Sequence, residues 1–137
     1  MKKSERPCIL LADDFPQLLE QVEKLLGKRF EIVGFAHDGG EALQLCLTLN
    51  PDILLLDLSM PVLCGLEVAA HLKESGCRSK IIIVTVQEDP DYVEIAFSLG
   101  VSAYVLKCRI ATDLLAAIDA VLNGSTFYSP FGAHVSA

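Results

Sequence analysis

The sequence predicts an α/β domain with a five-stranded parallel sheet, doubly wound in the strand order 2-1-3-4-5. Unbroken apolar runs, such as Ile53–Leu56 and the β-branched run Lys80–Thr85, are typical of strands buried on both faces. Five such runs alternate strictly with segments of helical periodicity. This alternation implies parallel strands joined by right-handed helical crossovers. A chain of 137 residues is too short for an eight-fold barrel, which leaves the open sheet.

The expected elements follow one another from Cys8 to Gly124. The expected strands are Cys8–Ala12, Phe30–Ala36, Ile53–Leu56, Lys80–Thr85 and Ala103–Lys107. Aspartates mark three helix starts: Asp13 or Asp14 before Pro16, Asp38 with Glu41 as a capping box, and Asp89 before Pro90. We expect residues 1–124 to form one domain. Residues 125–137, rich in Ser, Pro and Gly, are expected to form a linker or tail.

Composition excludes several classes of protein. The chain is 52% hydrophobic and 21% charged, which favours a folded domain over disorder. A net charge of −7 argues against a nucleic-acid surface within these residues. There is no apolar stretch of membrane-spanning length, and the run after the basic N-terminus is too short for a signal peptide. The five cysteines have no C-x-x-C spacing, so we expect reduced thiols in a cytoplasmic protein.

Polar side chains stand where the expected strands end, and in open α/β sheets chemistry collects at the carboxyl ends of the strands. Asp57 directly follows the apolar run Ile53–Leu56, and Pro61 prevents that strand from continuing. In the order 2-1-3-4-5, the other strands bring further polar groups to the same rim: Asp13, Asp14, Thr85 and Lys107. The sequence therefore predicts one polar rim around Asp57.

Three carboxylates on one rim favour a bound cation. Two like charges ~4 Å apart repel by roughly 4 kcal/mol at an effective dielectric constant of 20. Donor sets made only of oxygen favour Mg²⁺, or Mn²⁺, over zinc. We therefore expect a divalent metal ion at Asp13, Asp14 and Asp57.

The set Asp13-Asp14, Asp57-Leu-Ser-Met-Pro61, Thr85 and Lys107 resembles the receiver domain of two-component response regulators. The resemblance covers residues 8 to about 123 and implies the flavodoxin-like or CheY-like sheet expected above. It implies that Asp57 accepts a phosphoryl group from a sensor histidine kinase in a Mg²⁺-dependent phosphorelay. The protein would be a phosphoacceptor that takes part in its own phosphorylation and dephosphorylation, not an enzyme. A partner or dimer surface would switch in response.

The resemblance also implies a role for each matching residue. Asp14 would bind Mg²⁺ directly, Asp13 through water, and Ser59 through its backbone carbonyl. Thr85 and Lys107 would contact the phosphoryl oxygens. Thr85 would also form the conformational switch together with Tyr104, which matches the aromatic switch position of the family.

This sequence departs from the family pattern at two positions. Cys108 stands where many receivers have proline after the lysine. Val86 stands where a smaller residue is common, and its size is expected to restrict access to Asp57.

The segment 123–130 resembles the stretch that leaves a receiver of the NarL/FixJ class, in which a LuxR-type helix-turn-helix domain follows. No such domain lies within these 137 residues. The chain is therefore either a stand-alone receiver or part of a longer regulator, and the tail favours the second. We expect homodimerisation on phosphorylation and control of transcription, but no DNA binding by these residues alone. The reason is that eleven basic residues, scattered along the chain, are outnumbered by eighteen acidic ones.

Two other functions compete with this interpretation. An aspartyl-nucleophile phosphohydrolase of the haloacid-dehalogenase type usually has a second Asp two residues after the nucleophile, and that position is Ser59 here. The length also leaves no room for a cap domain. A receiver-like interaction module that never accepts phosphate would not need the acidic pair, Thr85 and Lys107, which are all present.

Overall fold

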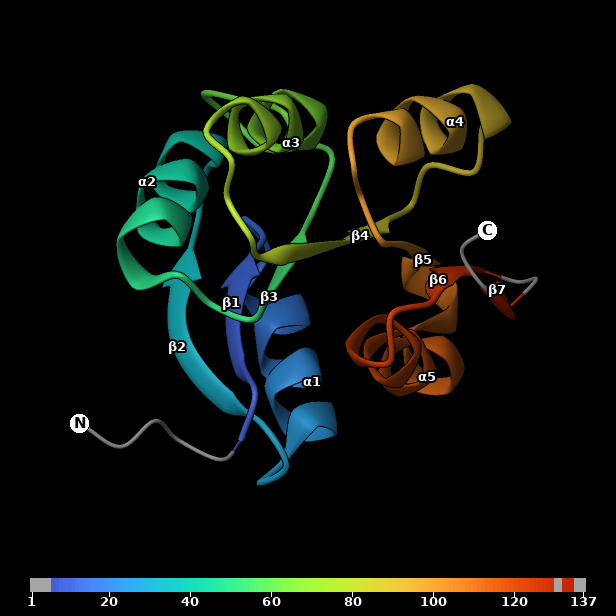
Figure 1. Cartoon of the computed structure of the whole chain (residues 1–137). Helices are drawn as coiled ribbons and strands as arrows, with labels where there is room; N and C mark the ends of the chain where they lie inside the picture. Colours follow the sequence, from blue (N-terminus) through green and yellow to red (C-terminus); the bar gives the residue numbers. More distant parts are fainter. Residues whose placement is uncertain (1–5, 130–131, 135–137) are drawn as a thin grey trace.

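The computed structural model describes residues 6–129 and 132–134 and shows one twisted sheet between two layers of helices (Figure 1). The strands are β1 (Cys8–Ala12), β2 (Glu31–Ala36), β3 (Ile53–Leu56), β4 (Lys80–Thr85), β5 (Ala103–Leu106), β6 (Thr126–Tyr128) and β7 (Gly132–His134). The helices are α1 (Pro16–Leu26), α2 (Gly39–Leu49), α3 (Gly65–Glu74), α4 (Pro90–Ser98) and α5 (Ile110–Leu122), with a 3₁₀ turn, η1, at Lys107–Arg109. None of the helices in these ranges is long and apolar enough to cross a membrane.

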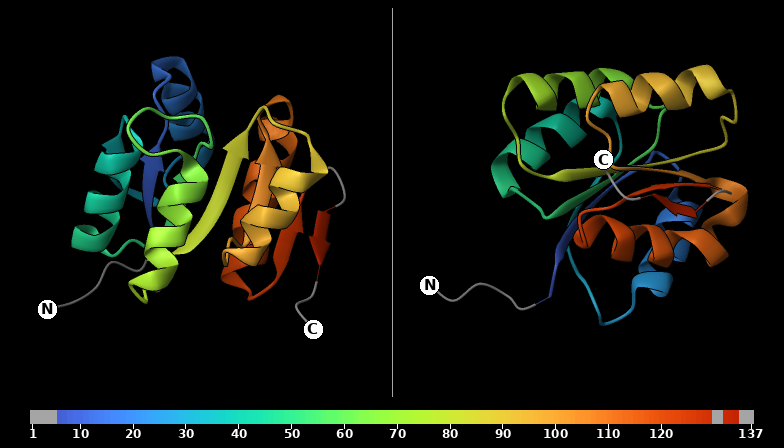
Figure 2. Two further views of the ribbon diagram at one scale, coloured as in Figure 1. Left: turned by 90° about the horizontal axis from the view of Figure 1, so that it is seen from above. Right: turned by 45° about the vertical axis from the view of Figure 1, so that its right-hand side comes forward.

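The sheet order is β2-β1-β3-β4-β5-β6-β7, and β1 to β5 are all parallel. The predicted class and the order 2-1-3-4-5 are therefore confirmed. Helices α2, α3 and α4 cover one face, while α1 and α5 cover the other (Figures 1 and 2). This is the placement that right-handed crossovers impose when the chain winds in both directions from the centre of a parallel sheet.

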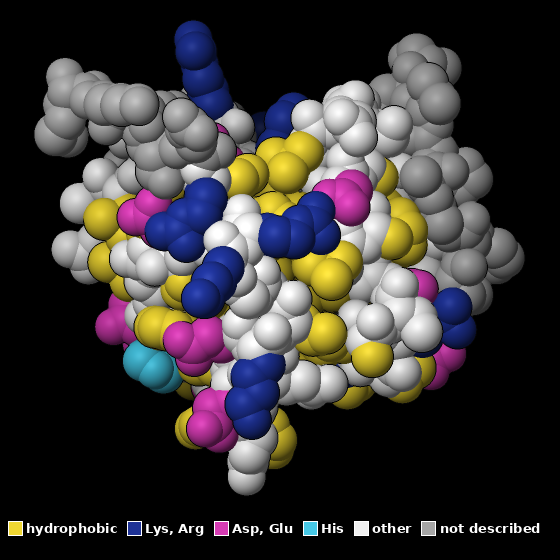
Figure 3. Space-filling view, turned by 90° about the horizontal axis from the view of Figure 1, so that it is seen from below, with side chains coloured by type: hydrophobic (Ala, Val, Ile, Leu, Met, Phe, Trp, Pro, Cys, Tyr) yellow, Lys and Arg dark blue, Asp and Glu magenta, His cyan; other side chains and the backbone are white. Residues whose placement is uncertain are grey.

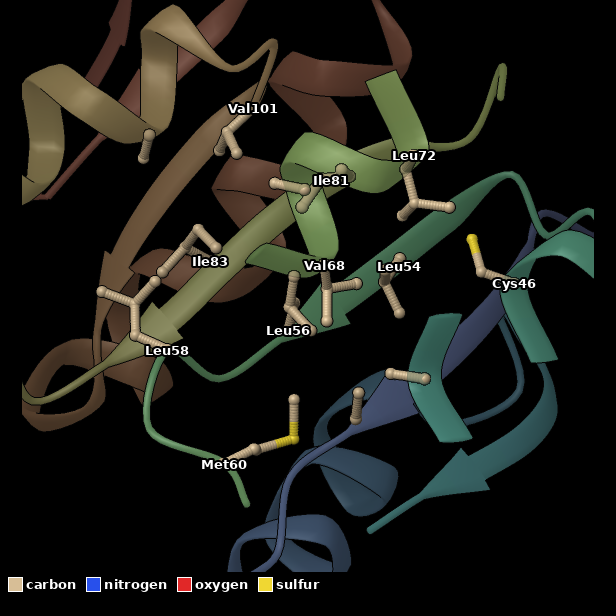
Figure 4. Close-up of a cluster of buried hydrophobic side chains, with 14 of the residues drawn as sticks. Cys46, Leu54, Leu56, Leu58, Met60, Val68, Leu72, Ile81, Ile83 and Val101 are labelled. Carbon is tan, nitrogen blue, oxygen red and sulfur yellow. The ribbon is translucent and has the colours of Figure 1, made fainter. Parts of the chain in front are cut away.

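The core consists of two clusters, one on each face of the sheet. Side chains alternate along a strand, so Leu54 and Leu56 of β3 point to one cluster and Ile53 and Leu55 to the other. Figure 4 shows the first cluster, where Leu54 and Leu56 lie under Val68 of α3. All four β3 residues are buried. Burial of each such side chain contributes roughly 1.5–3 kcal/mol, which explains the unbroken apolar run.

Two short strands extend the sheet beyond the five expected. β6 lies parallel to β5, with Phe127 opposite Ala103 and Tyr128 opposite Tyr104, and β7 pairs antiparallel with β6. Both strands fall in the region expected to be a linker or tail, because three-residue strands have no periodicity that a sequence pattern could reveal. The segment joins the sheet at the free edge of β5, and Phe127 is buried in the cluster under α5. The rest of the expected tail, residues 130–131 and 135–137, lies outside the described residues, as do residues 1–5 of the expected domain.

The helix starts agree with the predicted caps in two of the three cases. Asp38 caps α2 by accepting a hydrogen bond from the Glu41 backbone N–H at 2.8 Å, and Asp89 caps α4. The reciprocal half of the predicted capping box does not form, because Glu41 Oε1 accepts from the His37 N–H at 2.7 Å. The cap predicted for α1 is wrong, because the N-cap residue is Phe15 and its side chain makes no capping bond. The Asp13 carboxylate is turned toward the rim instead, and only its Oδ1 accepts a local hydrogen bond, from the Phe15 N–H at 2.8 Å.

Candidate functional site

Three charged side chains meet at the carboxyl end of the sheet. Asp13 follows β1, Asp57 follows β3, and Ala12 pairs with Leu56, so the two aspartates leave neighbouring strands at the same level. The Lys107 Nζ lies 3.1 Å from Asp13 Oδ2 and 3.5 Å from Asp57 Oδ2. Asp13 is 3% exposed and Asp57 5% exposed. The structure thus brings together two carboxylates and one ammonium from three strands, as the sequence predicts. Lys107 itself lies just past β5, in the turn η1, and not at the end of the strand.

One oxygen each from Asp13, Asp14 and Asp57 lies within 4.8 Å of the others. Asp14 is exposed, while the other two aspartates are buried. The buried Asp13 Oδ2 has no hydrogen-bond partner among the described residues, since its contact with Lys107 is an ion pair without hydrogen-bond geometry. An unsatisfied buried carboxylate oxygen is costly, and a cation would satisfy it. The oxygen donors present therefore fit a hard divalent metal ion such as Mg²⁺.

The surroundings of Asp57 raise the pKa of its carboxyl group. Burial is the largest cause and the charge of Asp13 the second, while Lys107 and the Ser59 backbone N–H act in the opposite direction. The Ser59 nitrogen lies 3.4 Å from Asp57 Oδ1. A desolvated carboxylate beside another negative charge is more basic than an exposed one. The charged form of Asp57 is consequently disfavoured by its surroundings, and an added positive charge at the rim would offset that cost.

Close backbone contacts hold the loop after Asp57. The Gly65 N–H donates to the Leu58 carbonyl at 2.8 Å, and a Cβ at Gly65 would come within 2.5 Å of the Asp57 carbonyl oxygen. Val62 has a φ of +73°, which is rare for a β-branched residue, and the Leu63 N–H donates across it to the Pro61 carbonyl at 2.9 Å. The close approach at Gly65 is not among the features predicted from the sequence. Its signal would have been a glycine in the first turn of an otherwise regular helix.

The two residues expected to form the switch are joined through the backbone of Gln87. Thr85 is fully buried, and its Oγ1 accepts a hydrogen bond from the Gln87 N–H at 3.1 Å. The Tyr104 hydroxyl donates to the Gln87 carbonyl at 2.7 Å. The Tyr104 ring is fully buried and meets the Tyr128 ring edge-on, with centroids 6.0 Å apart. Burial, then the charges of neighbouring groups, raise the pKa of Tyr104 to about 12, so its hydroxyl remains a donor.

Large apolar side chains stand beside the acidic rim. Phe15 is 59% exposed and Val86 73% exposed, and together with Lys107 they line an open hollow of about 430 Å³. Exposed Phe and Val side chains next to a charged site are available to a partner surface. The expected effect of Val86 on access to Asp57 stays a prediction.

Comparisons with known proteins agree with this geometry. The profile of the response regulator receiver domain matches residues 9–119. YvfU of Bacillus subtilis, an uncharacterized transcriptional regulatory protein, is 38% identical over 124 residues. The nitrate/nitrite response regulator protein NarL of Escherichia coli K12 is 34% identical over 131 residues. These alignments cover 89% and 94% of this chain but only 62% and 61% of the two relatives.

Solved structures show the same relationship. A two-component response regulator of the LuxR family from Aurantimonas superposes with a TM-score of 0.86 at 32% identity, covering 93% of this chain and 92% of that one. The chain spans about three fifths of the length of the curated relatives named above. On the profile match and these identities, the chain belongs to the response regulator receiver domain family of two-component systems, in its NarL/LuxR class.

Proposed function

We propose that this chain is the phosphoryl-accepting switch of a two-component system, and that Asp57 is the phosphoacceptor. The observation that carries the proposal is the position of Lys107, whose ammonium lies within 3.5 Å of both Asp13 and Asp57. A cation held at that point can pair with the negatively charged phosphoryl oxygens once the group is attached to Asp57. Receivers are phosphoacceptors and not enzymes in the usual sense, and the donor proposed here is a sensor histidine kinase.

The chemistry proposed for Asp57 is a displacement at phosphorus. A carboxylate oxygen of Asp57 attacks the phosphoryl group, the bond between phosphorus and the donor histidine nitrogen breaks, and the imidazole keeps the electron pair and takes up a proton. The raised pKa of Asp57 favours the attack. Lys107 then pairs with a phosphoryl oxygen, and the Thr85 hydroxyl can donate to another.

We further propose that Asp13 and Asp14 hold Mg²⁺ beside Asp57, Asp14 directly and Asp13 through water, with the Ser59 backbone carbonyl as another ligand. When bound, the ion supplies positive charge that offsets the phosphoryl oxygens. The proximity of the three carboxylates and the unsatisfied Asp13 Oδ2 support this assignment. Mn²⁺ fits the same donors.

Acetyl phosphate with Mg²⁺ tests the proposal by mass spectrometry of the intact chain. We expect the wild type to gain one phosphoryl group, and the gain to disappear with EDTA or in Asp57→Asn. Asp91→Asn, which changes an exposed aspartate in the first turn of α4, is the matched control and should label like the wild type. Asp14→Ala should lose Mg²⁺ binding more completely than Asp13→Ala. Equal labelling of Asp57→Asn would overturn the assignment.

The output of the switch is proposed from the relatives. YvfU is named as a transcriptional regulatory protein and NarL as a response regulator, and this chain aligns with only about three fifths of each. We propose that phosphorylation changes a dimer or partner surface and so controls transcription through a DNA-binding domain outside these residues. The cytoplasm is the proposed location, where a kinase and DNA are both accessible.

A further inference from the structure

After α5 the chain forms β6 within residues 125–129, here called the exit segment, and β7 then pairs antiparallel with β6. Ser129 at the end of the exit segment is fully buried. Its hydroxyl donates to Asp113 Oδ2 at 2.5 Å, and its backbone N–H donates to the Tyr104 carbonyl at 2.9 Å. Only two residue pairs join β6 to β5. The buried contacts of Ser129 therefore act together with the burial of Phe127 and the pairing with β7 to keep the exit segment on the sheet.

Asp113 is the buried centre of a polar cluster outside the proposed phosphorylation site. It is 7% exposed, although it carries a charge in the first turn of α5. Arg109 binds it with Nε at 2.8 Å from Oδ2, and the Thr112 hydroxyl donates to Oδ1 at 3.2 Å. Burial alone would raise the pKa of Asp113, but the hydrogen bonds from Arg109 and Ser129 outweigh it and lower the pKa. Asp113 is thus a carboxylate that ties the start of α5 to the exit segment.

Two of the contacts that hold the exit segment, the Asp113 hydrogen bond and the Tyr104 carbonyl bond, lead back to groups that would contact the phosphoryl group. Arg109 ends the same three-residue turn that begins with Lys107, so the turn links the Asp113 cluster to the ammonium at Asp57. On the other side, Tyr104 accepts the Ser129 N–H through its carbonyl. The Tyr104 hydroxyl donates a hydrogen bond to the Gln87 carbonyl, and the Gln87 N–H donates one to the Thr85 hydroxyl oxygen. The exit segment is held between the two groups that respond to charge on Asp57.

We propose that Asp113 is a positioning residue that couples the state of Asp57 to the attachment of the exit segment. The proposal rests on the proposed function. A phosphoryl group on Asp57 draws Lys107 away from Asp13 and turns the Thr85 hydroxyl away from the Gln87 N–H. The turn Lys107–Arg109 then pulls on Asp113, and the contact between Gln87 and Tyr104 weakens. Both contacts loosen together, and the exit segment separates more readily from β5.

Hydrogen exchange of the intact chain tests the coupling, with acetyl phosphate and Mg²⁺ as the probe and the phosphoryl mass measured on the same sample. The informative amides are those of Phe127 and Ser129, which donate to Ser102 and Tyr104. We expect phosphorylation of the wild type to speed their exchange by about tenfold, as local opening becomes easier. In Asp113→Asn the baseline exchange should be faster, and phosphorylation should change it by less than about twofold.

Two further variants keep the test decisive. Ser129→Ala removes only the hydroxyl contact with Asp113, and phosphorylation should no longer speed amide exchange in this variant. It tests the coupling even if Asp113→Asn is too unstable to measure. Asp119→Asn on the same helix removes an exposed ion pair with Arg29 and should respond like the wild type. A phosphorylated wild type with unchanged exchange, or a full response in Asp113→Asn or Ser129→Ala, would overturn the coupling. If the wild type gains no phosphoryl mass, the proposed function fails instead.

Discussion

At the scale of single residues, the site holds two negative charges in a buried environment, which is energetically unfavourable. Asp13 and Asp57 are buried side by side, and Lys107 is the cation that offsets them within the described residues. The raised pKa of Asp57 shows that Lys107 does not offset the cost fully. The arrangement makes the rim responsive, because any group that adds or removes charge there changes which partner Lys107 prefers.

Replacing Asp57 by Asn should stabilise the metal-free fold at neutral pH. A folded-state pKa raised above the unfolded value means that the charged carboxylate destabilises the fold at pH above the folded pKa. The destabilisation disappears as the pH falls through the folded pKa toward the unfolded value near 4. We therefore expect Asp57→Asn in EDTA to raise the Tm by roughly 2–4 °C at pH 7. The difference in Tm between Asp57→Asn and the wild type should become smaller as the pH is lowered.

Thermal unfolding of the wild type, Asp57→Asn and Asp91→Asn between pH 4 and pH 8 measures this effect. Asp91→Asn controls for the loss of one negative charge from the molecule, and its Tm difference should stay small throughout. A difference for Asp57→Asn that is constant with pH would show that burial and Asp13 do not destabilise the charged form.

At the scale of elements, the start of α3 and the end of β3 are built around each other. Gly65 allows the first turn of α3 to touch the Asp57 backbone, and its N–H is bonded to Leu58. The start of α2 reaches the same loop, since the Gly39 N–H donates to the Pro61 carbonyl at 3.0 Å. Two helices thus hold one loop through backbone contacts, and Asp57 is placed by the fold more than by its own side-chain contacts.

Gly65→Ala should therefore destabilise the domain although Ala favours helices. The new Cβ would meet backbone atoms that cannot give way, whereas at Gly40 it would meet the Val62 side chain at 3.1 Å. We expect Gly65→Ala to lower the free energy of unfolding by about 2 kcal/mol, typical of overpacking. Gly40→Ala, the control, should change it by less than about 1 kcal/mol. Urea unfolding measures both, and equal stability of the two variants would contradict the close approach.

At the scale of the whole molecule, most basic residues lie at one end of the sheet. Among the described residues, Lys107 and Arg109 are the basic residues that follow the carboxyl end of a strand. The others lie in the last turns of α1 and α3 or in the stretches that lead into β1, β2 and β4: Arg6, Lys24, Lys28, Arg29, Lys73, Arg78 and Lys80. Figure 3 shows Lys and Arg side chains near acidic ones on the face of α1 and α5. Basic residues that are scattered along the sequence therefore gather at the end opposite Asp57.

Even so, these residues alone should not bind DNA specifically, phosphorylated or not. Part of the basic end is already neutralised, since Arg29 pairs with Asp119 at 3.0 Å and Arg6 with Glu31 at 4.0 Å. The opposite rim is acidic and becomes more negative on phosphorylation. DNA affinity needs clustered free cations facing the phosphates. We expect no sequence-specific band in a low-salt gel shift, and self-association on phosphorylation in sedimentation.

Asp57→Asn, treated with acetyl phosphate in the same way, should sediment unchanged and is the control. A band that survives excess competitor DNA would disprove the first part of this prediction. Phosphorylated protein that sediments at the same rate as the untreated protein would disprove the second.

Much of this molecule could be predicted from local sequence patterns. The bounds of β1, β3 and β4 follow from apolar runs, because burial of such side chains is decided by neighbouring residues. The rim also follows from such patterns. Once the strands are parallel, the residues after them meet at one edge, as Asp13, Asp57 and Lys107 do.

Other features depend on contacts between distant residues, which no local pattern encodes. Ser129 reaches Asp113 across 16 positions, and Tyr104 reaches Gln87 across 17, because strand register and helix packing bring single atoms together. The same holds for β6, a strand too short to have a period, which forms because β5 offers a free edge. Periodicity records which side of an element is buried, whereas a hydrogen bond between elements requires a particular register. The polar rim around Asp57 could thus be predicted from the sequence, but the network around Asp113 exists only in the folded protein.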